Sequence, residues 1–366
     1  MEAGAVSGIL DTTLALVFTW VGYKTSMIIY KYTPYSYPNA RIKAMEAKLL
    51  TEQRFNELAE SRTLQNFVVS LEDTPYRDYL ADLQSYDVES IERALEKALA
   101  GTYELMAKIL PKRVNPFFRL LLEEWDVRNI TSVVKAKLAG EPATDYVVEI
   151  GPMLQKVKAM AEAKSMEEIL VILEGTPYEE PYQKLLLGEI DARAFETELY
   201  KMHYGKLLDY ALSKKDEERT ILEEFIRLRI DKLNILTALR GKAARLSAEE
   251  IRPMLIPGGS VKLDPLLHVE DLSMALAELD STKYGPVIRD VREEVEKDLG
   301  VLERVLEEHI IERMNELNRF YPLSVATPLG YVLQKEREVR KLRAIAKLIS
   351  DGLPPERIKE LAGDVA

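Results

Sequence analysis

Hydrophobic positions recur at helical spacing along most of this chain of 366 residues, and apolar and polar residues rarely alternate as they would in a β-strand. The helical spacing is clearest in three long runs, over residues 117–139, 216–240 and 331–351. Each run is directly followed by a glycine, which ends helices readily because it adopts the left-handed conformation without strain. The pattern predicts an all-α protein.

A similar set of residues occurs three times, about 105 residues apart. Segments 71–76, 173–178 and 279–284 read LEDTPY, LEGTPY and LDSTKY. About 50 residues after each comes a second shared segment, and these read WDVRNI, IDKLNI and REVRKL. We therefore predict three similar helical domains built from a triplicated unit. The predicted domain limits are an N-terminal leader over 1–33 and repeats over 34–144, 145–256 and 257–366.

Helix-capping residues support the repeat. Thr63, Ser165 and Asp271 each lie thirteen residues before the repeated tyrosine, and all three side chains accept hydrogen bonds from the free N–H groups of a helix start. Glu168, three residues after Ser165, predicts a capping box. The prolines of the first two copies predict that the capped helix ends before them.

The repeated tyrosines close the same segments. We predict that Tyr76, Tyr178 and Tyr284 place their rings in the core and point their hydroxyl groups outward.

The leader differs from the rest of the chain. Residues 12–30 carry a single charge, at Lys24, yet they include too many hydroxyl-bearing residues for a confident membrane-spanning helix. The acidic Glu2 argues against a secretory signal. We predict an amphipathic segment that lies on a membrane or a membrane protein, with Phe18, Trp20 and Tyr23 near the interface. The alternative is a helix packed on the body of the protein itself.

Composition and motifs exclude several kinds of chemistry. The net charge of −11 disfavours nonspecific nucleic-acid binding, and the absence of cysteine excludes disulfides and thiolate metal sites. The three histidines, two in predicted long helices (His203, His309) and one in a loop (His268), have no partner at a metal-ligand spacing. No phosphate-binding loop, nucleophile elbow or dinucleotide fingerprint occurs. We expect no catalytic residue, no metal and no cofactor.

Charged residues of the second repeated segment are the candidates for function. Acid and base stand at most two positions apart there, hence on different faces of one helix, which favours partner contacts over a catalytic pair. A solvated helix face with intrahelical ion pairs is the alternative. The predicted partner-contact residues are Asp126, Arg128, Lys135, Asp231, Lys232, Arg240, Glu338, Arg340 and Lys347.

Residues 37–45 (YPNARIKAM) and 115–119 (NPFFR), together with the triplicated unit, resemble the C subunit of archaeal and bacterial A/V-type rotary ATPases and its eukaryotic counterpart, the d subunit of the vacuolar proton pump. The resemblance covers about residues 34–352. It implies a funnel of three helical domains around a pseudo-threefold axis, present in one copy per complex. It also implies a place between the D and F subunits of the shaft and the membrane ring of proteolipid c-type subunits, on the cytoplasmic face of the membrane.

In that family the ATPase chemistry belongs to the A and B subunits, and ion passage belongs to the ring and the a-type subunit. The resemblance therefore implies a subunit that transmits torque and is not itself an enzyme. A static helical scaffold is the alternative, although solenoid repeats are usually about 20 to 50 residues long. An enzyme is the third possibility, and it would need ionisable residues clustered in one copy alone.

Overall fold

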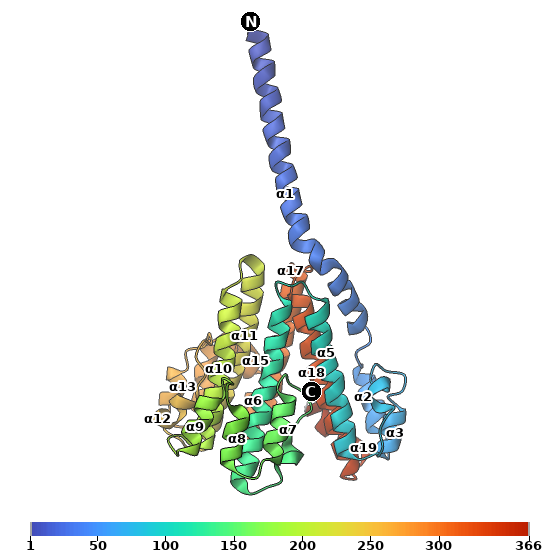
Figure 1. Ribbon diagram of the computed structural model, residues 1–366, viewed down its shortest axis with the longest axis vertical. Coiled ribbons are helices and arrows are strands. Elements are labelled where there is room, and N and C mark those ends of the chain that lie inside the picture. The colour runs from blue at the N-terminus through green and yellow to red at the C-terminus, as the bar shows by residue number, and fades with distance from the viewer. Residues whose placement is uncertain (1, 365–366) are drawn as a thin grey trace.

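The computed structural model describes the backbone of residues 2–364 and the side chains of residues 14–363. Within that part every regular element is a helix, which confirms the predicted all-α class (Figure 1).

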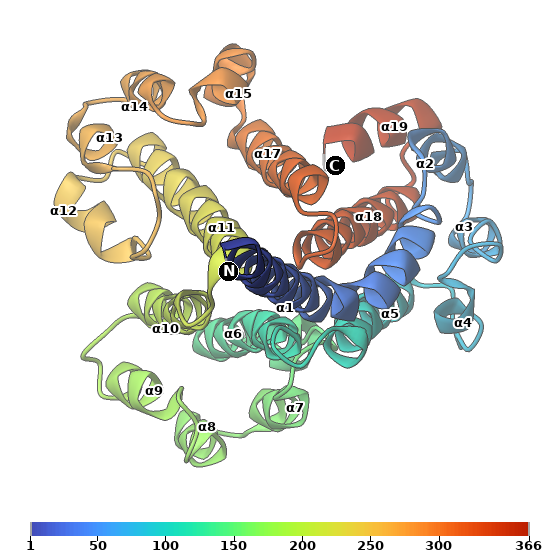
Figure 2. The ribbon, with the colours of Figure 1, turned by 90° about the horizontal axis from the view of Figure 1, so that it is seen from above.

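Six long helices form the centre of the molecule. Each packs on the next in chain order, and the last packs back on the first, so that the six close a circle. Figure 2 looks along this bundle and shows the helices gathered around the middle of the view. In order they are α5 (Val88–Ile109), α6 (Asn115–Ala139), α10 (Ala192–Leu212), α11 (Asp216–Ala243), α17 (Leu299–Phe320) and α18 (Ala326–Ser350).

Short helices lie outside the circle in three arcs (Figure 2). The first arc contains α2 (Glu52–Ala59), α3 (Leu64–Val69) and α4 (Arg77–Leu80). The second contains η1 (Ala143–Tyr146), α7 (Leu154–Glu162), α8 (Met166–Leu173) and α9 (Glu179–Leu186). The third contains α12 (Ala248–Ile251), η2 (Arg252–Met254), α13 (Asp264–His268), α14 (Leu272–Glu278), η3 (Leu279–Ser281), α15 (Gly285–Arg289) and α16 (Arg292–Lys297). The C-terminal α19 (Pro355–Asp364) packs on α18 and α2.

Most predicted helix ends are observed. Thr63, Ser165 and Asp271 cap α3, α8 and α14 through their side chains, as predicted. The capping box at Ser165 is wrong, because the Glu168 carboxylate accepts from the Lys164 N–H instead of the Ser165 N–H.

Three further boundaries differ from the sequence pattern. α11 continues past Gly241 to Ala243, since this glycine stays helical and faces Ile251. α18 begins five residues earlier than predicted, and His268 ends α13 instead of lying in a loop.

The core contacts join each copy to its neighbour. One buried cluster runs from Val127 on α6 through α7, α8 and α9 to Leu199 on α10. The repeated Thr-Pro-Tyr segment thus packs on the long helix that precedes it in the chain, and the first such segment packs on α18, the last long helix. The limits 34–144, 145–256 and 257–366 stay a prediction, although these contacts pass across them.

The leader is part of α1 (Glu2–Glu46), a single helix of 45 residues with Pro34 and Pro38 inside it. Prolines remove backbone hydrogen bonds and bend helices, and α1 changes direction along its course (Figure 1). Its lower part packs on α18, and the Asn39 amide donates to the carbonyl groups of Pro322 and Ser324 in the loop before α18.

The upper part of α1 projects away from the body and rises over the central helices, not over an outer arc (Figures 1 and 2). The alternative of a leader packed on its own protein is therefore wrong for residues 14–30, which are all exposed. The amphipathic prediction is wrong too, because exposed apolar residues such as Leu16, Val17 and Phe18 follow one another around the helix and do not gather on one face. No helix in the described part is long and apolar enough to span a membrane.

Candidate functional site

The three repeated acids lie inside the protein and organise three similar joints. Each joint consists of an acid on a long helix, the backbone of the linker that begins the next outer arc, and a repeated tyrosine. At the Asp231 joint, on α11, the carboxylate accepts from the N–H groups of Ser260 and Val261, at 2.7 and 3.1 Å. It also accepts from the Tyr284 hydroxyl at 2.9 Å.

The Glu338 joint, on α18, closes the circle between the last copy and the first. The Glu338 carboxylate accepts from the Leu50 N–H at 2.6 Å and from the Tyr76 hydroxyl at 2.6 Å. The Asp126 joint, on α6, has the Met153 N–H at 2.9 Å and Tyr178 nearby. These acids are at most 5% exposed. They are therefore used for packing, and a partner cannot reach them in this conformation.

The tyrosines were predicted correctly in one respect only. Their rings are buried, as expected. The hydroxyl groups of Tyr76 and Tyr284 point inward to the acids and not outward. Burial raises the pKa of both hydroxyls well above the ordinary value, and the neighbouring carboxylates raise it further.

The six basic candidates are all paired, and three of them lie at the surface. Lys135 pairs with Glu196, Arg240 with Glu303, and Lys347 with Asp351. Their side chains are 47%, 56% and 60% exposed, so that a partner can reach them. Arg128, Lys232 and Arg340 instead line a cleft at the centre of the molecule. Partner contact at these six positions stays a prediction.

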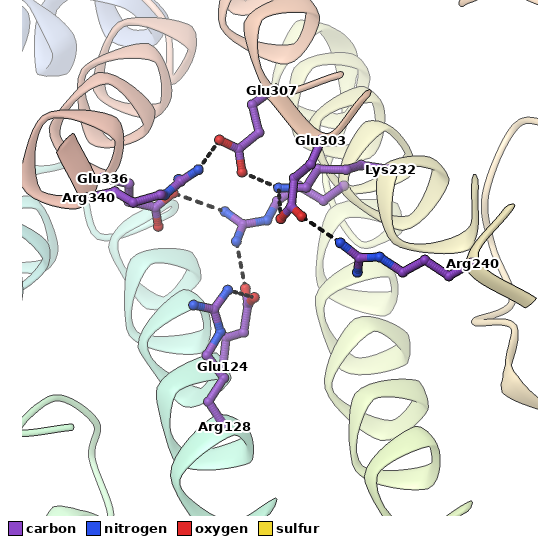
Figure 3. Close-up of polar contacts among 9 residues, drawn as sticks. Glu124, Arg128, Lys232, Arg240, Glu303, Glu307, Glu336 and Arg340 are labelled. Carbon is purple, nitrogen blue, oxygen red and sulfur yellow. Dashed lines mark hydrogen bonds and ion pairs between the residues drawn. The ribbon is translucent and has the colours of Figure 1, made fainter. Parts of the chain in front are cut away.

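The central cleft has a volume of about 490 Å³ and is lined by all six long helices. Its charged lining comprises six cationic and four carboxylate side chains. Figure 3 shows charged residues of α6, α11, α17 and α18 pointing toward one another there. Glu307 of α17 binds Lys232 and Arg340 together, which connects α11 with α18.

Equivalent positions of the three copies meet beside this cleft. Glu124, Arg229 and Glu336 each stand two residues before the repeated acid of their copy. Arg229 lies between the two carboxylates, 2.7 Å from Glu124 and 3.8 Å from Glu336. Burial would raise the pKa of Glu124, but Arg229 and Arg128 outweigh burial and lower it to about 2. The site is thus an array of paired charges at the centre of the circle of helices.

Sequence reasoning missed this axial cluster because it examined the repeated acids and not their neighbours. A signal existed, since the position two residues before each acid is charged in all three copies. Asn129 and Asn234 were also missed. Each is buried and exchanges hydrogen bonds with the backbone of the following linker, at Val148 and Ile256.

No group of three or more His, Asp or Glu side chains in the described residues is arranged to hold a metal ion. His203 is 4% exposed, and burial lowers its pKa to about 4. His309 packs its ring on Tyr284, with centroids 5.2 Å apart. The charged side chains of the cleft can form ion pairs with a charged partner.

A family model for the ATP synthase (C/AC39) subunit matches residues 38–361. The chain belongs to this family. The C subunit of the A-type ATP synthase of Thermococcus onnurineus (strain NA1) is 80% identical over 366 residues, and the match covers 100% of both chains. That of Desulfurococcus sp. (strain SY) is 79% identical over 362 residues, with 99% and 100% covered. That of Pyrococcus abyssi (strain GE5 / Orsay) is 59% identical over 370 residues, with 100% of both covered. The family resemblance predicted from the sequence is confirmed. Membership in this family of ATP synthase subunits implies that the chain is part of a larger complex.

Proposed function

We propose that this protein is the non-catalytic central-stalk subunit that couples the rotating shaft, made of the D and F subunits, to the proteolipid c-ring in the membrane. It acts in one copy per complex, on the cytoplasmic face of the membrane, with the A, B and a-type subunits in the same assembly. The observation that carries the proposal is the shared axis. The six long helices close a circle around this axis, and the charged cleft lies at the centre of the circle. The projecting part of α1 rises over the same centre (Figure 2).

The circle suits the transmission of torque. Close-packed helices are stiff and transmit strain, and each long helix here is held by two neighbours. Ion pairs across the axis, such as Arg229 with Glu124, add links between copies that are far apart in sequence. A turning force applied on the axis is therefore passed to the whole body.

The cleft and the projecting part of α1 offer different surfaces. The cleft has more cationic than carboxylate side chains, although the chain carries a net charge of −11. Charge complementarity therefore favours a shaft end that presents carboxylates. Most exposed side chains of the projecting part of α1 are apolar and point to several sides of the helix, which favours an apolar surrounding. We place this segment in the centre of the c-ring.

Contacts at the base of the projecting part of α1, here called the rod, set its direction. The Tyr35 hydroxyl donates to Glu218 at 2.7 Å, and the Arg113 guanidinium lies over the Tyr35 ring at 5.2 Å. Lys31 pairs with Asp216 at 3.1 Å. These contacts tie α1 to α11 and to the start of α6, so that the helix leaves the body in a fixed direction.

The test is purification of the complex from native membranes in mild detergent through a C-terminal tag, with mass spectrometry of the proteins recovered. We expect the c-ring proteolipid and the D, F, A and B subunits, with one copy of this chain. A chain recovered alone, or with unrelated partners, contradicts the proposal and leaves a static scaffold.

Photo-cross-linking then tests the position of the projecting part of α1. Benzoylphenylalanine at Phe18, which is 72% exposed on the rod, is expected to label the c-ring proteolipid. The same probe at Val171, which is 68% exposed on an outer arc, is the matched control and should not. Lipid adducts from Phe18, with none to protein, contradict the position inside the ring while leaving the coupling role intact.

A further inference from the structure

The Asp126 joint differs from the other two in its charges. At the Asp231 joint Lys283 lies 3.2 Å from the carboxylate, and at the Glu338 joint Lys335 lies at 2.7 Å. Asp126 is 1% exposed, and among the described residues no cationic side chain forms an ion pair with it. A buried carboxylate without a counter-charge disfavours its ionised form.

The repeat explains why the counter-charge is missing. The position of Lys283 in the third copy corresponds to Pro177 in the second. The position of Lys335, three residues before the repeated acid, corresponds to Glu123 on α6. Both sites that supply a lysine at another joint therefore hold a neutral or an acidic residue here.

The groups that face Asp126 do little to stabilise its ionised form. Glu123, on the same helix, is itself acidic and is paired with Lys206 of α10 at 2.6 Å. Tyr178, at the start of α9, forms no hydrogen bond with Asp126, whereas Tyr76 and Tyr284 both donate to their acids. The linker provides one backbone N–H, from Met153, and Gly151 packs directly on the carboxylate. Burial, with a smaller effect of Glu123, raises the pKa of Asp126 to about 7.

We propose that the Asp126 joint is a proton-operated latch, which holds the second outer arc on α6 while Asp126 is protonated and loosens when it ionises. The other two joints keep a lysine beside the acid. The latch gives one of the three outer arcs a sensitivity to pH that its two counterparts lack.

The direction of the pH effect follows from the different pKa of Asp126 in the closed and the open joint. In the closed joint Asp126 holds its proton up to about pH 7, whereas an open, solvated aspartate releases it near pH 4. Between these values the open form loses the proton first, so that rising pH favours opening. Above about pH 7 both forms are ionised and the effect reaches a plateau.

The experiment is hydrogen exchange of the full-length chain at pH 5 and pH 8, with each rate divided by that of the unprotected peptide at the same pH. Peptides from residues 148–178 report on the Asp126 joint, and peptides from residues 256–284 report on the Asp231 joint as an internal control. We expect the opening of 148–178 to increase roughly tenfold to a hundredfold from pH 5 to pH 8. The control segment should not change in this way.

Two substitutions separate the latch from a general effect of pH. Asp126→Asn cannot ionise and should remove the pH dependence. Pro177→Lys copies the third copy and supplies the missing cation, so that it should also remove the dependence with Asp126 in place. The matched control is Pro75→Lys, at a joint that already has Lys335. The proposal is overturned if 148–178 responds no more than 256–284, or if either Asp126→Asn or Pro177→Lys keeps the response of the unaltered protein.

Discussion

Removal of the Glu338 side chain should open the circle of helices at its closing joint. In Glu338→Ala the Lys335 ammonium, whose side chain is 6% exposed, loses its carboxylate partner at 2.7 Å. The Tyr76 hydroxyl and the Leu50 N–H lose their acceptor as well. Breaking a buried pair by removing one partner costs about 3–5 kcal/mol. The Tyr76 ring, 3.9 Å from the Lys335 nitrogen, remains and offsets part of the loss. We therefore expect a loss of about 3 kcal/mol.

The assay is reversible guanidinium unfolding followed by far-ultraviolet circular dichroism, with Glu308→Ala as the matched control. Glu308 likewise pairs with a cationic side chain of α18, that of Arg337 at 3.5 Å, but the Glu308 side chain is 43% exposed. An exposed pair of this kind contributes at most about 1 kcal/mol. Glu338→Ala should therefore lose clearly more stability than Glu308→Ala.

A double variant tests the cause. Lys335→Met with Glu338→Leu removes both charges, and replacement of a buried pair by apolar residues is often neutral. We expect the double variant to be more stable than Glu338→Ala. Equal losses in Glu338→Ala and Glu308→Ala, or a double variant as unstable as the single one, would refute the account of an uncompensated Lys335.

Three further predictions concern single positions. His203 should stay neutral from pH 8 to pH 5 in an NMR titration of its ring, because burial lowers its pKa to about 4; the free energy of unfolding should then fall between about pH 6.5 and pH 4, and His203→Gln should lack that component. Gly241→Ala would place a methyl group 2.6 Å from Ile251, and the overpacking cost of about 1–3 kcal/mol should lower the melting temperature. The control Gly205→Ala, whose methyl group meets open space in α10, should raise the melting temperature slightly. Phe117→Ala should cost about 3–5 kcal/mol in denaturant unfolding, because its buried ring packs on Phe118, Tyr210 and Phe225, while Phe320→Ala, at 77% exposed, should change stability by about 0.5 kcal/mol or less.

Local features of this protein were predictable because they depend on nearby residues. The caps at Thr63, Ser165 and Asp271 follow from hydrogen-bonding geometry within three residues of each cap. The helix over residues 117–139 ends where Gly140 adopts a φ of 72°. By contrast Gly241, with the same residue type after a similar run, stays helical because its missing side chain leaves room for Ile251. That contact comes from the fold and is not written in the local pattern.

The candidate site was only partly predictable, because it too depends on contacts between residues that are far apart in the sequence. The repeat identified Asp126, Asp231 and Glu338 correctly as equivalent residues, but spacing along one helix says nothing about which face is covered by another copy. The three acids point to the linkers and tyrosines of a neighbouring copy, so that they are buried. The axial meeting of Glu124, Arg229 and Glu336 likewise depends on how three distant helices converge.

The circle of helices is continuous in the polypeptide except at one place. Peptide bonds lead from α5 to α6 and onward to α18, whereas α18 and α5 are joined by packing and by side-chain pairs such as Arg343 with Glu96 at 3.2 Å. Short linkers join only α5 to α6, α10 to α11 and α17 to α18, whereas the chain between α6 and α10 and between α11 and α17 runs through a whole outer arc. Mechanically the body is therefore three helical hairpins held side by side. A load that spreads the circle is carried by packing and side-chain pairs between the hairpins, so that the circle parts there before it parts within a hairpin.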